Sequence, residues 1–236
     1  MSRKIILSSI LGIALLLTGC KGKTNKSVVE SENNSSGNTS ESSSSSSSSS
    51  EEIKYEVEQS VWEEAFSLEH IAFESNFTSS TTLNGRTVIT EFDESKAHVT
   101  IQYSGDFSDD LYIHFLEKIG DDTVNLDQYN HYNEDWICDY KDYRSLSAYL
   151  SDCGIISFPY DEFTFDEESN EYVCEKEIII LIGVNRYTHF KNIRVQFENN
   201  HLKYANYVYI NNVEYPTVSE FSNFGTTSVT LPEVVR

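Results

Sequence analysis

Residues 76–103 read NFTSSTTLNGRTVITEFDESKAHVTIQY, and this stretch decides the fold because the period of its sequence changes to two. In its last third, Ala97, Val99 and Ile101 alternate with polar residues, which is the period of a strand with one buried face. Asn84-Gly85 in the middle is the dipeptide that most favours a two-residue hairpin turn. The segment therefore predicts antiparallel strands joined by tight turns.

The same signals continue along the rest of the chain. Alternating segments are separated by turn residues such as Gly120-Asp121-Asp122 and the polar run 166–170. The unbroken apolar run at 177–184 predicts a strand that is buried on both faces. We expect about nine or ten short strands in mostly antiparallel order, among them 76–83, 88–92, 111–115, 123–132, 163–165, 172–174, 193–197, 202–210 and a last one at 226–231.

Two segments have the period of an α-helix. The first carries an apolar stripe with steps of three and four residues, formed by Val57, Val61, Ala65, Leu68 and Ala72 and widened by Trp62, Phe66 and Phe73. The second covers 142–150. An amphipathic helix buries its apolar face against another element, so both are expected to pack on the sheet, the first with its aromatic side inward. The predicted fold class is α+β, mainly antiparallel.

The amino terminus carries the pattern of an export signal. Arg3 and Lys4 precede an apolar run of about 13 residues, whereas a membrane-spanning helix needs about 20. Leu17-Thr18-Gly19-Cys20 resembles the lipobox of a bacterial lipoprotein at all four positions. The resemblance implies cleavage before Cys20 and diacylglycerol on its sulfur, usually with a fatty acid such as palmitate on the new amino terminus. That places the chain on the extracytoplasmic face of the cell membrane; the alternative is an ordinary signal peptide whose cleavage site happens to contain Cys.

A low-complexity segment follows the lipobox. Residues 21–52 are mainly Lys, Ser, Asn, Glu, Thr and Gly and include consecutive serines at 42–50, so they cannot bury a core and are expected to be a disordered tether. Such a tether has a root-mean-square reach of roughly 30 Å. The expected organisation is a signal peptide at 1–19, the lipidated cysteine and linker at 20–52, and a single domain at 53–236.

The charge balance excludes one class of partner. The chain has a formal net charge of −21, and removal of Arg3 and Lys4 with the signal peptide makes the remainder more acidic still. A strongly acidic surface repels nucleic acid and anionic lipid headgroups. We therefore expect no nucleic-acid partner; a solvated, soluble exterior is the plain interpretation of the charge, and a cation-binding surface is the sharper one.

Three cysteines follow Cys20, at Cys138, Cys153 and Cys174. They form no CxxC pair and have no zinc-site spacing. An extracytoplasmic compartment permits disulfides, and the short intervening loop favours a Cys138–Cys153 bridge. Three buried free thiols that pack as small apolar side chains are an equal alternative.

The order of elements in the domain resembles the half-barrel of LolA and of LppX/LprG-type lipoproteins. The segments that prompt the resemblance are VWEEAF at 61–66, SNFT at 75–78, IRVQFENNHL at 193–202 and FSNFGTTSVTLP at 221–232. The resemblance implies a curved sheet that holds acyl chains between its concave face and the helices. Five aromatic residues are candidates to line such a pocket, or alternatively to fill it as core: Trp62, Phe66, Tyr103, Phe115 and Phe197.

No catalytic or cofactor motif stands out. The chain lacks GxSxG, HExxH, GxxxxGK[ST] and GxGxxG patterns, so we expect no enzyme activity and no cofactor. His98 and His114 lie on predicted strands and are expected to face solvent or a polar pocket. Acidic clusters near 106–110, 121–127 and 161–168 are expected to be turns, with calcium as the alternative.

The sequence thus predicts a membrane-anchored lipoprotein that binds a lipid or another amphipathic ligand without catalysis. The alternative is an envelope scaffold with a filled core that contacts another envelope protein.

Overall fold

The computed structural model describes residues 56–104, 108–133 and 135–234. They belong to one compact unit that spans residues 51–236. The predicted signal peptide, the lipobox with Leu17, Thr18, Gly19 and Cys20, and the linker to residue 52 lie outside the described residues. Within the described part, no helix is long and apolar enough to cross a membrane.

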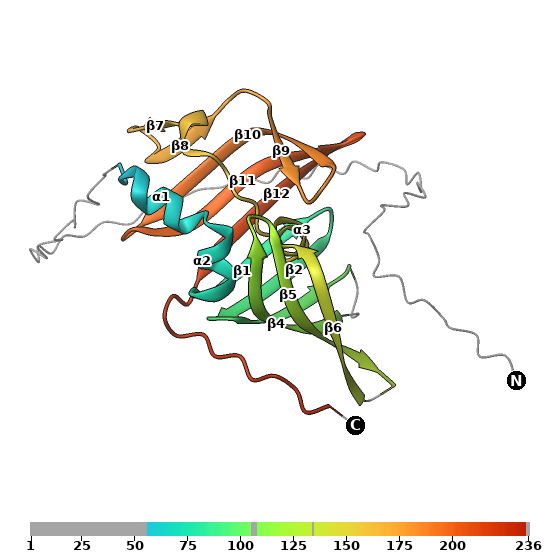
Figure 1. The fold of residues 1–236 in the computed structure, drawn as a ribbon. Coiled ribbons are helices and arrows are strands. Elements are labelled where there is room, and N and C mark those ends of the chain that lie inside the picture. The colour runs from blue at the N-terminus through green and yellow to red at the C-terminus, as the bar shows by residue number, and fades with distance from the viewer. Residues whose placement is uncertain (1–55, 105–107, 134, 235–236) are drawn as a thin grey trace, which may run out of the picture. The chain divides into compact units, whose positions relative to one another are not determined.

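The elements run from two helices into a long meander of strands (Figure 1). The first half contains α1 (Gln59–Ala65), α2 (Leu68–Phe73), β1 (Asn76–Leu83), β2 (Arg86–Asp93), β3 (Lys96–Gln102), β4 (Ser108–Gly120), β5 (Thr123–Tyr132), β6 (Asp135–Ser145) and α3 (Leu146–Asp152). The second half contains η1 (Tyr160–Glu162), β7 (Thr164–Asp166), β8 (Glu171–Cys174), β9 (Ile178–Ile182), β10 (Arg186–Glu198), β11 (His201–Asn211) and β12 (Val213–Ser222).

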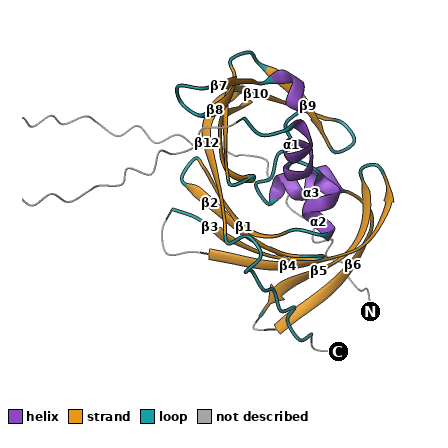
Figure 2. Cartoon of the chain, turned by 90° about the vertical axis from the view of Figure 1, so that its left-hand side faces the viewer, coloured by secondary structure: helices purple, strands orange, loops and turns teal. Residues whose placement is uncertain are grey.

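All twelve strands form one antiparallel sheet in the order β6-β5-β4-β3-β2-β1-β12-β11-β10-β8-β7, with β9 paired to β10 beside β8. The sheet curves into an open half-barrel, and the helices lie in its hollow (Figure 2). The predicted α+β half-barrel is therefore confirmed. The pairing of β1 with β12 is the seam at which the two ends of the meander meet.

Side-chain burial in β3 alternates with the period of two that residues 76–103 predict. Ala97 and Val99 are buried while their neighbours are partly exposed. The Asn84-Gly85 turn joins β1 to β2, and both residues have positive φ, at 51° and 73°, as a primed two-residue hairpin turn requires. The bounds of β1 and β5 coincide with the predicted strands at 76–83 and 123–132.

The interior of the half-barrel holds two clusters of buried residues. One lies under β7–β12 and includes Trp62 and Phe158, and the other lies under β1–β6 and includes Phe92 and Leu150. Phe221 packs against both clusters, so the core is continuous across the β1–β12 seam.

A network of hydrogen bonds ties α3 to both ends of the sheet. Asp122, in the β4–β5 turn, accepts hydrogen bonds from the Ser147 backbone N (2.6 Å) and hydroxyl (3.0 Å). The Ser147 hydroxyl in turn accepts a bond of 2.8 Å from the Gly183 N in the β9–β10 turn. This Asp122–Ser147–Gly183 clasp joins the first half of the sheet to the β9–β10 hairpin across the hollow.

Both helix predictions need correction. The stripe from Val57 to Ala72 predicted one helix, but the structure contains two, because the Ser67 hydroxyl caps a new helix by accepting from the His70 N at 3.2 Å. The predicted helix at 142–150 begins later, at Leu146, because residues up to Ser145 belong to β6. Tyr143, inside the range predicted as helix, is 72% exposed and has positive φ.

Two strand predictions are also wrong. Residues 226–231 form no strand; the last strand is β12, which the sequence pattern did not predict. The apolar run at 177–184 is not buried on both faces, because β9 is 57% exposed at Ile179 and 48% exposed at Leu181.

Candidate ligand-binding site

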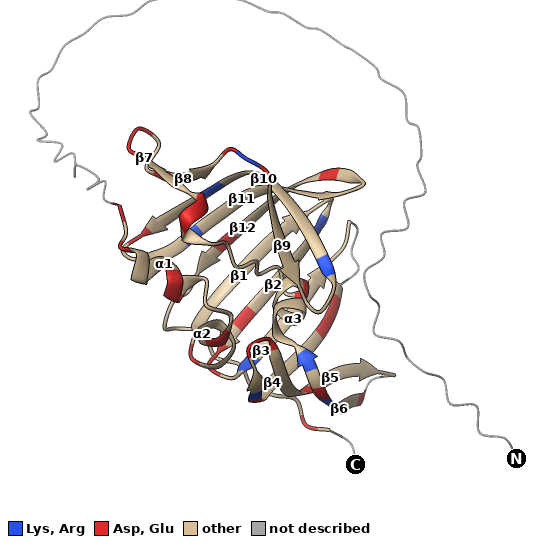
Figure 3. Cartoon of the chain, turned by 45° about the horizontal axis from the view of Figure 1, so that its top comes forward, with Lys and Arg blue, Asp and Glu red and all other residues tan. Residues whose placement is uncertain are grey.

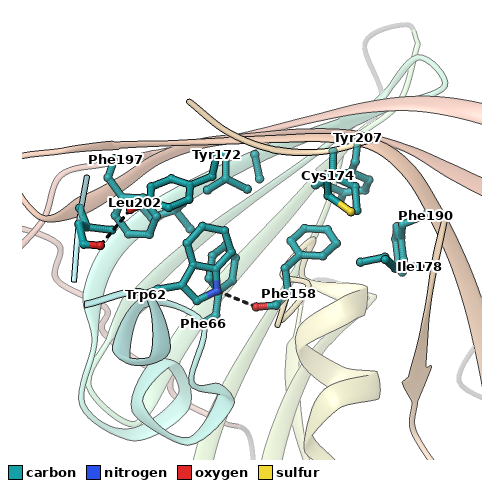
Figure 4. Close-up of a cluster of buried hydrophobic side chains, with 14 of the residues drawn as sticks. Trp62, Phe66, Phe158, Tyr172, Cys174, Ile178, Phe190, Phe197, Leu202 and Tyr207 are labelled. Atoms are coloured by element: carbon teal, nitrogen blue, oxygen red, sulfur yellow. Dashed lines mark hydrogen bonds between the residues drawn. The ribbon is translucent and has the colours of Figure 1, made fainter. Parts of the chain in front are cut away.

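The hollow of the half-barrel is filled by aromatic side chains where β7–β12 curve over α1 (Figure 4). Trp62 lies at the centre with 1% of its surface exposed, and its indole N–H donates to the Phe158 carbonyl at 2.8 Å. Its ring packs at centroid distances of 4.8 Å from Phe66, 4.8 Å from Phe163 and 5.0 Å from Tyr172. A buried indole with its N–H satisfied is a core arrangement.

The five aromatic residues that the sequence offered as pocket lining do not line a pocket. Trp62, Phe66 and Phe197 belong to the cluster under β7–β12, and Phe115 is buried in the other cluster. Tyr103 lies just beyond β3 and is 40% exposed, with the Arg86 guanidinium 5.9 Å from its ring centroid. The burial of the other four supports the alternative that aromatics fill the interior.

An open cavity of about 460 Å³ lies beside the helices, where β1 and β11 begin and β12 ends. Its volume falls within the usual range for small-molecule sites, which is about 300–1,000 Å³. The residues that line it come from segments far apart in the chain: Val61, Glu64, Ala65, His70, Ile71, Glu74, Ser75, Asn76, Phe77, Asn200, His201, Leu202, Phe221, Phe224 and Gly225. None of the five predicted pocket residues is among them.

The floor of the cavity is apolar and contains a stack of rings. Phe224 packs parallel to Phe77 at 5.7 Å and to His201 at 4.4 Å. Phe221 lies 5.9 Å from Phe77. The cavity therefore offers aromatic surface at one end of the half-barrel, although the centre of the half-barrel is full.

Asn76 at the start of β1 holds the loop that carries Phe224. Its side-chain amide donates to the Thr227 carbonyl at 2.7 Å, and its amide oxygen accepts from the Thr227 N at 2.7 Å. Its backbone carbonyl accepts from the Gly225 N at 2.8 Å. Gly225 has a φ of 69°, a left-handed conformation that costs glycine little. These bonds explain why Phe224 turns back toward β1.

The rim of the cavity is acidic and centres on one histidine. The two ring nitrogens of His70 face different carboxylates, with Nε2 3.5 Å from Glu64 and Nδ1 3.2 Å from Glu74. The break between α1 and α2 at Ser67 brings Glu64 to the opposite side of His70 from Glu74. Among the described residues that line the cavity there is no lysine or arginine. Figure 3 shows the acidic residues on α1 and α2 among those of the whole unit.

A second polar group occupies the outer face of the sheet. His98 on β3 has Nδ1 2.9 Å from Glu91 and Nε2 3.4 Å from Asp110. Its ring stacks on Tyr112 at 4.3 Å, and Trp136 meets the other side of Tyr112 at 5.1 Å. Burial raises the pKa of Tyr112, and the carboxylates of Asp110 and Glu91 add to that shift. These residues are cross-strand neighbours on β2–β6, and such pairs stabilise a sheet.

The predicted Cys138–Cys153 disulfide is not formed; both cysteines are free. Their side chains lie on opposite faces of the sheet. Cys138 on β6 is paired with Tyr129, next to Gln128, whose amide accepts from the Tyr149 hydroxyl of α3 at 2.9 Å. Successive side chains of a strand point to opposite faces, so Cys138 faces outward while Cys153 is buried within. Burial raises the pKa of the Cys153 thiol to about 12, as for an inert core cysteine.

The acidic turns carry structural hydrogen bonds. Asp166 in the β7–β8 turn accepts from the Glu168 N at 3.0 Å and from the Ser169 hydroxyl at 2.8 Å. These bonds hold the pKa of the Asp166 carboxyl below its usual value. In the described part of the chain, no group of three or more His, Cys, Asp or Glu residues is placed to hold a metal ion.

Comparison with protein-family models, with curated proteins and with solved structures gave no match. What the molecule can bind is therefore argued from its own geometry.

Proposed function

We propose that this protein is a lipid-anchored, extracytoplasmic binding domain that holds a small amphipathic ligand without chemical conversion. The observation that carries the proposal is the cavity of about 460 Å³ with an apolar floor and a polar rim. Such a site orients a ligand by burying its apolar part and leaving its polar part at the opening. The lipobox pattern Leu17-Thr18-Gly19-Cys20 supports the anchor.

The ligand site differs from the one implied by the half-barrel resemblance. There, acyl chains lie between the concave sheet and the helices, but here Trp62, Phe158 and their neighbours occupy that space. The free volume lies instead at the end of the sheet, between α1–α2 and the loop that carries Phe224. We therefore expect one short apolar group, and not the long acyl chains of a whole lipid, in the site.

The test is binding of 1-decanol to the full-length chain in nanodiscs, followed by ligand-observed NMR. Wild type is expected to bind, and Ala65→Trp, which places an indole at the cavity wall, is expected to lower affinity at least tenfold. Gln59→Trp adds the same ring to an exposed position of α1 outside the cavity and should leave affinity unchanged. No binding by wild type, or equal losses in both variants, would contradict the proposed site.

The anchor has its own test. Expression in a bacterial host with labelled palmitate should label the chain at Cys20, and Cys20→Ser should abolish both labelling and membrane retention. A Cys20→Ser chain that remains labelled would contradict the lipoprotein assignment.

A second candidate function is protein interaction, and the exposed β9 strand favours it. Among the described residues β9 pairs only with β10, so its other edge has unpaired backbone groups. Tyr187 on β10 is 69% exposed and lies opposite Leu181, which extends the apolar surface of Ile179 and Leu181. An apolar edge strand is a template for an added strand from a partner.

Cross-linking in intact cells tests this candidate. Leu181→Lys is expected to abolish cross-linking to a partner protein, because a charge on the edge strand opposes strand addition. Val213→Lys is the matched control, since Val213 is 47% exposed on β12. Identical cross-links in wild type and Leu181→Lys would contradict a role for β9.

A further inference from the structure

We infer that the ligand of the α1–α2 cavity is an organic cation, with an amine or quaternary ammonium head on a short apolar body. The inference rests on the proposed function and adds the charge of the ligand. It follows from three features of the cavity: the sign of its ionisable groups, their convergence on one point, and the aromatic rings of its floor.

The ionisable side chains at the rim favour a positive ligand. Glu64 and Glu74 are carboxylates, and His70 and His201 are the other titratable groups that line the described cavity. An anionic head at this rim would lie beside two like charges and would lose hydration, and no lysine or arginine among the residues that line the described cavity would compensate it. A cationic head would gain from both carboxylates.

The two carboxylates converge although they come from different helices. Both approach the His70 ring, Glu64 at 3.5 Å and Glu74 at 3.2 Å. Both carboxylates therefore add to the negative potential at the opening beside His70. The side chains of Glu64 and Glu74 are 68% and 70% exposed, and that of His70 is 31% exposed, so a ligand head can approach them from solvent.

The floor adds a second attraction for a cation. Phe77, Phe221 and Phe224 contribute rings to the cavity, and aromatic rings attract an ammonium group through their negative π-electron density. The remaining lining from Val61, Ile71 and Leu202 suits an alkyl body. Carboxylates at the opening and rings below them are thus complementary to an amphipathic cation.

Three probes with the same ten-carbon chain separate charge from apolar burial: decyltrimethylammonium, 1-decanol and decanoate. Each is titrated below its micelle concentration into the full-length chain in neutral-lipid nanodiscs, with empty nanodiscs as the blank. The cation is expected to bind at least tenfold more tightly than 1-decanol, and decanoate more weakly than either. Raising the salt concentration should reduce the advantage of the cation, because the carboxylates are exposed to screening.

Matched charge variants locate the effect. Glu64→Gln combined with Glu74→Gln should remove the preference for the cation while leaving the affinity for 1-decanol within twofold. Glu58→Gln combined with Glu63→Gln changes the net charge equally at two exposed positions that do not line the cavity, one just before α1 and one within it. This control pair should keep the preference.

Each outcome has one interpretation. Equal affinities for the three probes overturn the inferred charge and leave the proposed binding function standing. Equal losses of preference in the two double variants assign the effect to the overall acidity of the protein and overturn the site. Failure of all three probes to bind wild type overturns both the inference and the proposed function.

Discussion

The two halves of the sheet bury their interiors in different ways. Under β1–β6 the core is largely aliphatic, with residues such as Val99, Val124 and Leu126 packed beneath α2 and α3. Under β7–β12 the core is built of rings around Trp62, whose partners are Phe66, Tyr160, Phe163, Tyr172 and Phe197. The outer surfaces do not repeat this contrast. The first half carries His98 between Glu91 and Asp110 and also exposes Tyr132 and Ile137, and the second half exposes Ile179, Leu181 and Tyr187.

The difference in core packing between the two halves bears on stability and on the position of the cavity. The first half packs mainly through aliphatic contacts, whereas in the second half five aromatic rings pack around the Trp62 indole of α1. Because the rings fill the hollow, the cavity is displaced to the end of the sheet, beside α1 and α2. The dense aromatic core thus both anchors the helix and determines where a ligand can enter.

Trp62→Ala is expected to have the largest effect on stability, and it tests whether the second half depends on a single side chain. Removing a fully buried indole costs about 3–5 kcal/mol of unfolding free energy, which urea denaturation would measure. Trp136→Ala is the control, because Trp136 is only partly buried on the outer face and should cost about 1 kcal/mol. Similar losses of unfolding free energy from the two substitutions would show that the second half does not depend on Trp62.

Gly154→Ala tests the seam between the halves. Gly154 follows α3 with a φ of 84°, and an added Cβ would lie 2.5 Å from the Thr81 hydroxyl on β1. The overlap and the strained backbone together are expected to cost about 2–3 kcal/mol. Gly225→Ala is the matched control: its φ is 69° but no atom lies within 4 Å of the added Cβ, so it should cost about 1 kcal/mol. Equal costs would exclude the steric explanation.

Asp122→Ala tests the clasp that joins the first half to the β9–β10 hairpin. It removes acceptors for the N–H and hydroxyl of Ser147, and loss of such a capping carboxylate costs about 1–2 kcal/mol. Hydrogen exchange at the Gly183 amide should accelerate, since its acceptor is the Ser147 hydroxyl. Asp121→Ala, at the exposed neighbour in the same turn, should change neither quantity. Unchanged exchange at Gly183 in Asp122→Ala would rule out coupling through the clasp.

Glu171→Gln gives the smallest expected effect and tests how a charge supports the aromatic half. Burial raises the pKa of Glu171, but hydrogen bonds from Tyr204 and Arg194 outweigh burial, and the net pKa lies below the usual 4.5. Ionised Glu171 therefore stabilises the fold above the unfolded-state pKa, and the contribution is lost as pH falls through the folded-state pKa.

Urea denaturation between pH 7 and pH 3 measures this contribution. The advantage of wild type over Glu171→Gln should stay constant down to about pH 5 and shrink below about pH 4.5. Glu175→Gln, at an exposed position after β8, provides the comparison. An advantage that grows on acidification would contradict the sign of the shift.

The predictable parts of the fold are those in which apolar residues face the core. β1 and β5 were predicted to the residue, and the Asn84-Gly85 turn was predicted from its dipeptide. β12 was missed because its inward face at the seam includes polar residues. There, the Thr81 hydroxyl donates to the Ser219 hydroxyl at 2.8 Å, and the buried Thr217 hydroxyl donates to the Tyr215 carbonyl. Such buried polar pairs leave no hydrophobic alternation in the sequence.

The candidate site was less predictable than the fold. The sequence identified aromatic residues, but aromatics in a core and aromatics in a pocket have the same local pattern. Phe77 and Phe224 are 147 positions apart in the chain, and the β1–β12 pairing and the hydrogen bonds of Asn76 to Gly225 and Thr227 bring their rings together. The local sequence around either residue does not predict that contact.

By itself, the sequence determined the strand period and the tight turns, because each of these is a property of neighbouring residues, and it determined the acidic composition, which is a sum over the chain. The tertiary structure decided that Trp62 and Phe197 fill the hollow, that Cys138 and Cys153 lie on opposite faces, and that Glu64 and Glu74 meet at one cavity. These contacts depend on the curvature of the sheet and on the break between α1 and α2. Both features require residues that are far apart in the sequence to pack together, so local patterns do not predict them.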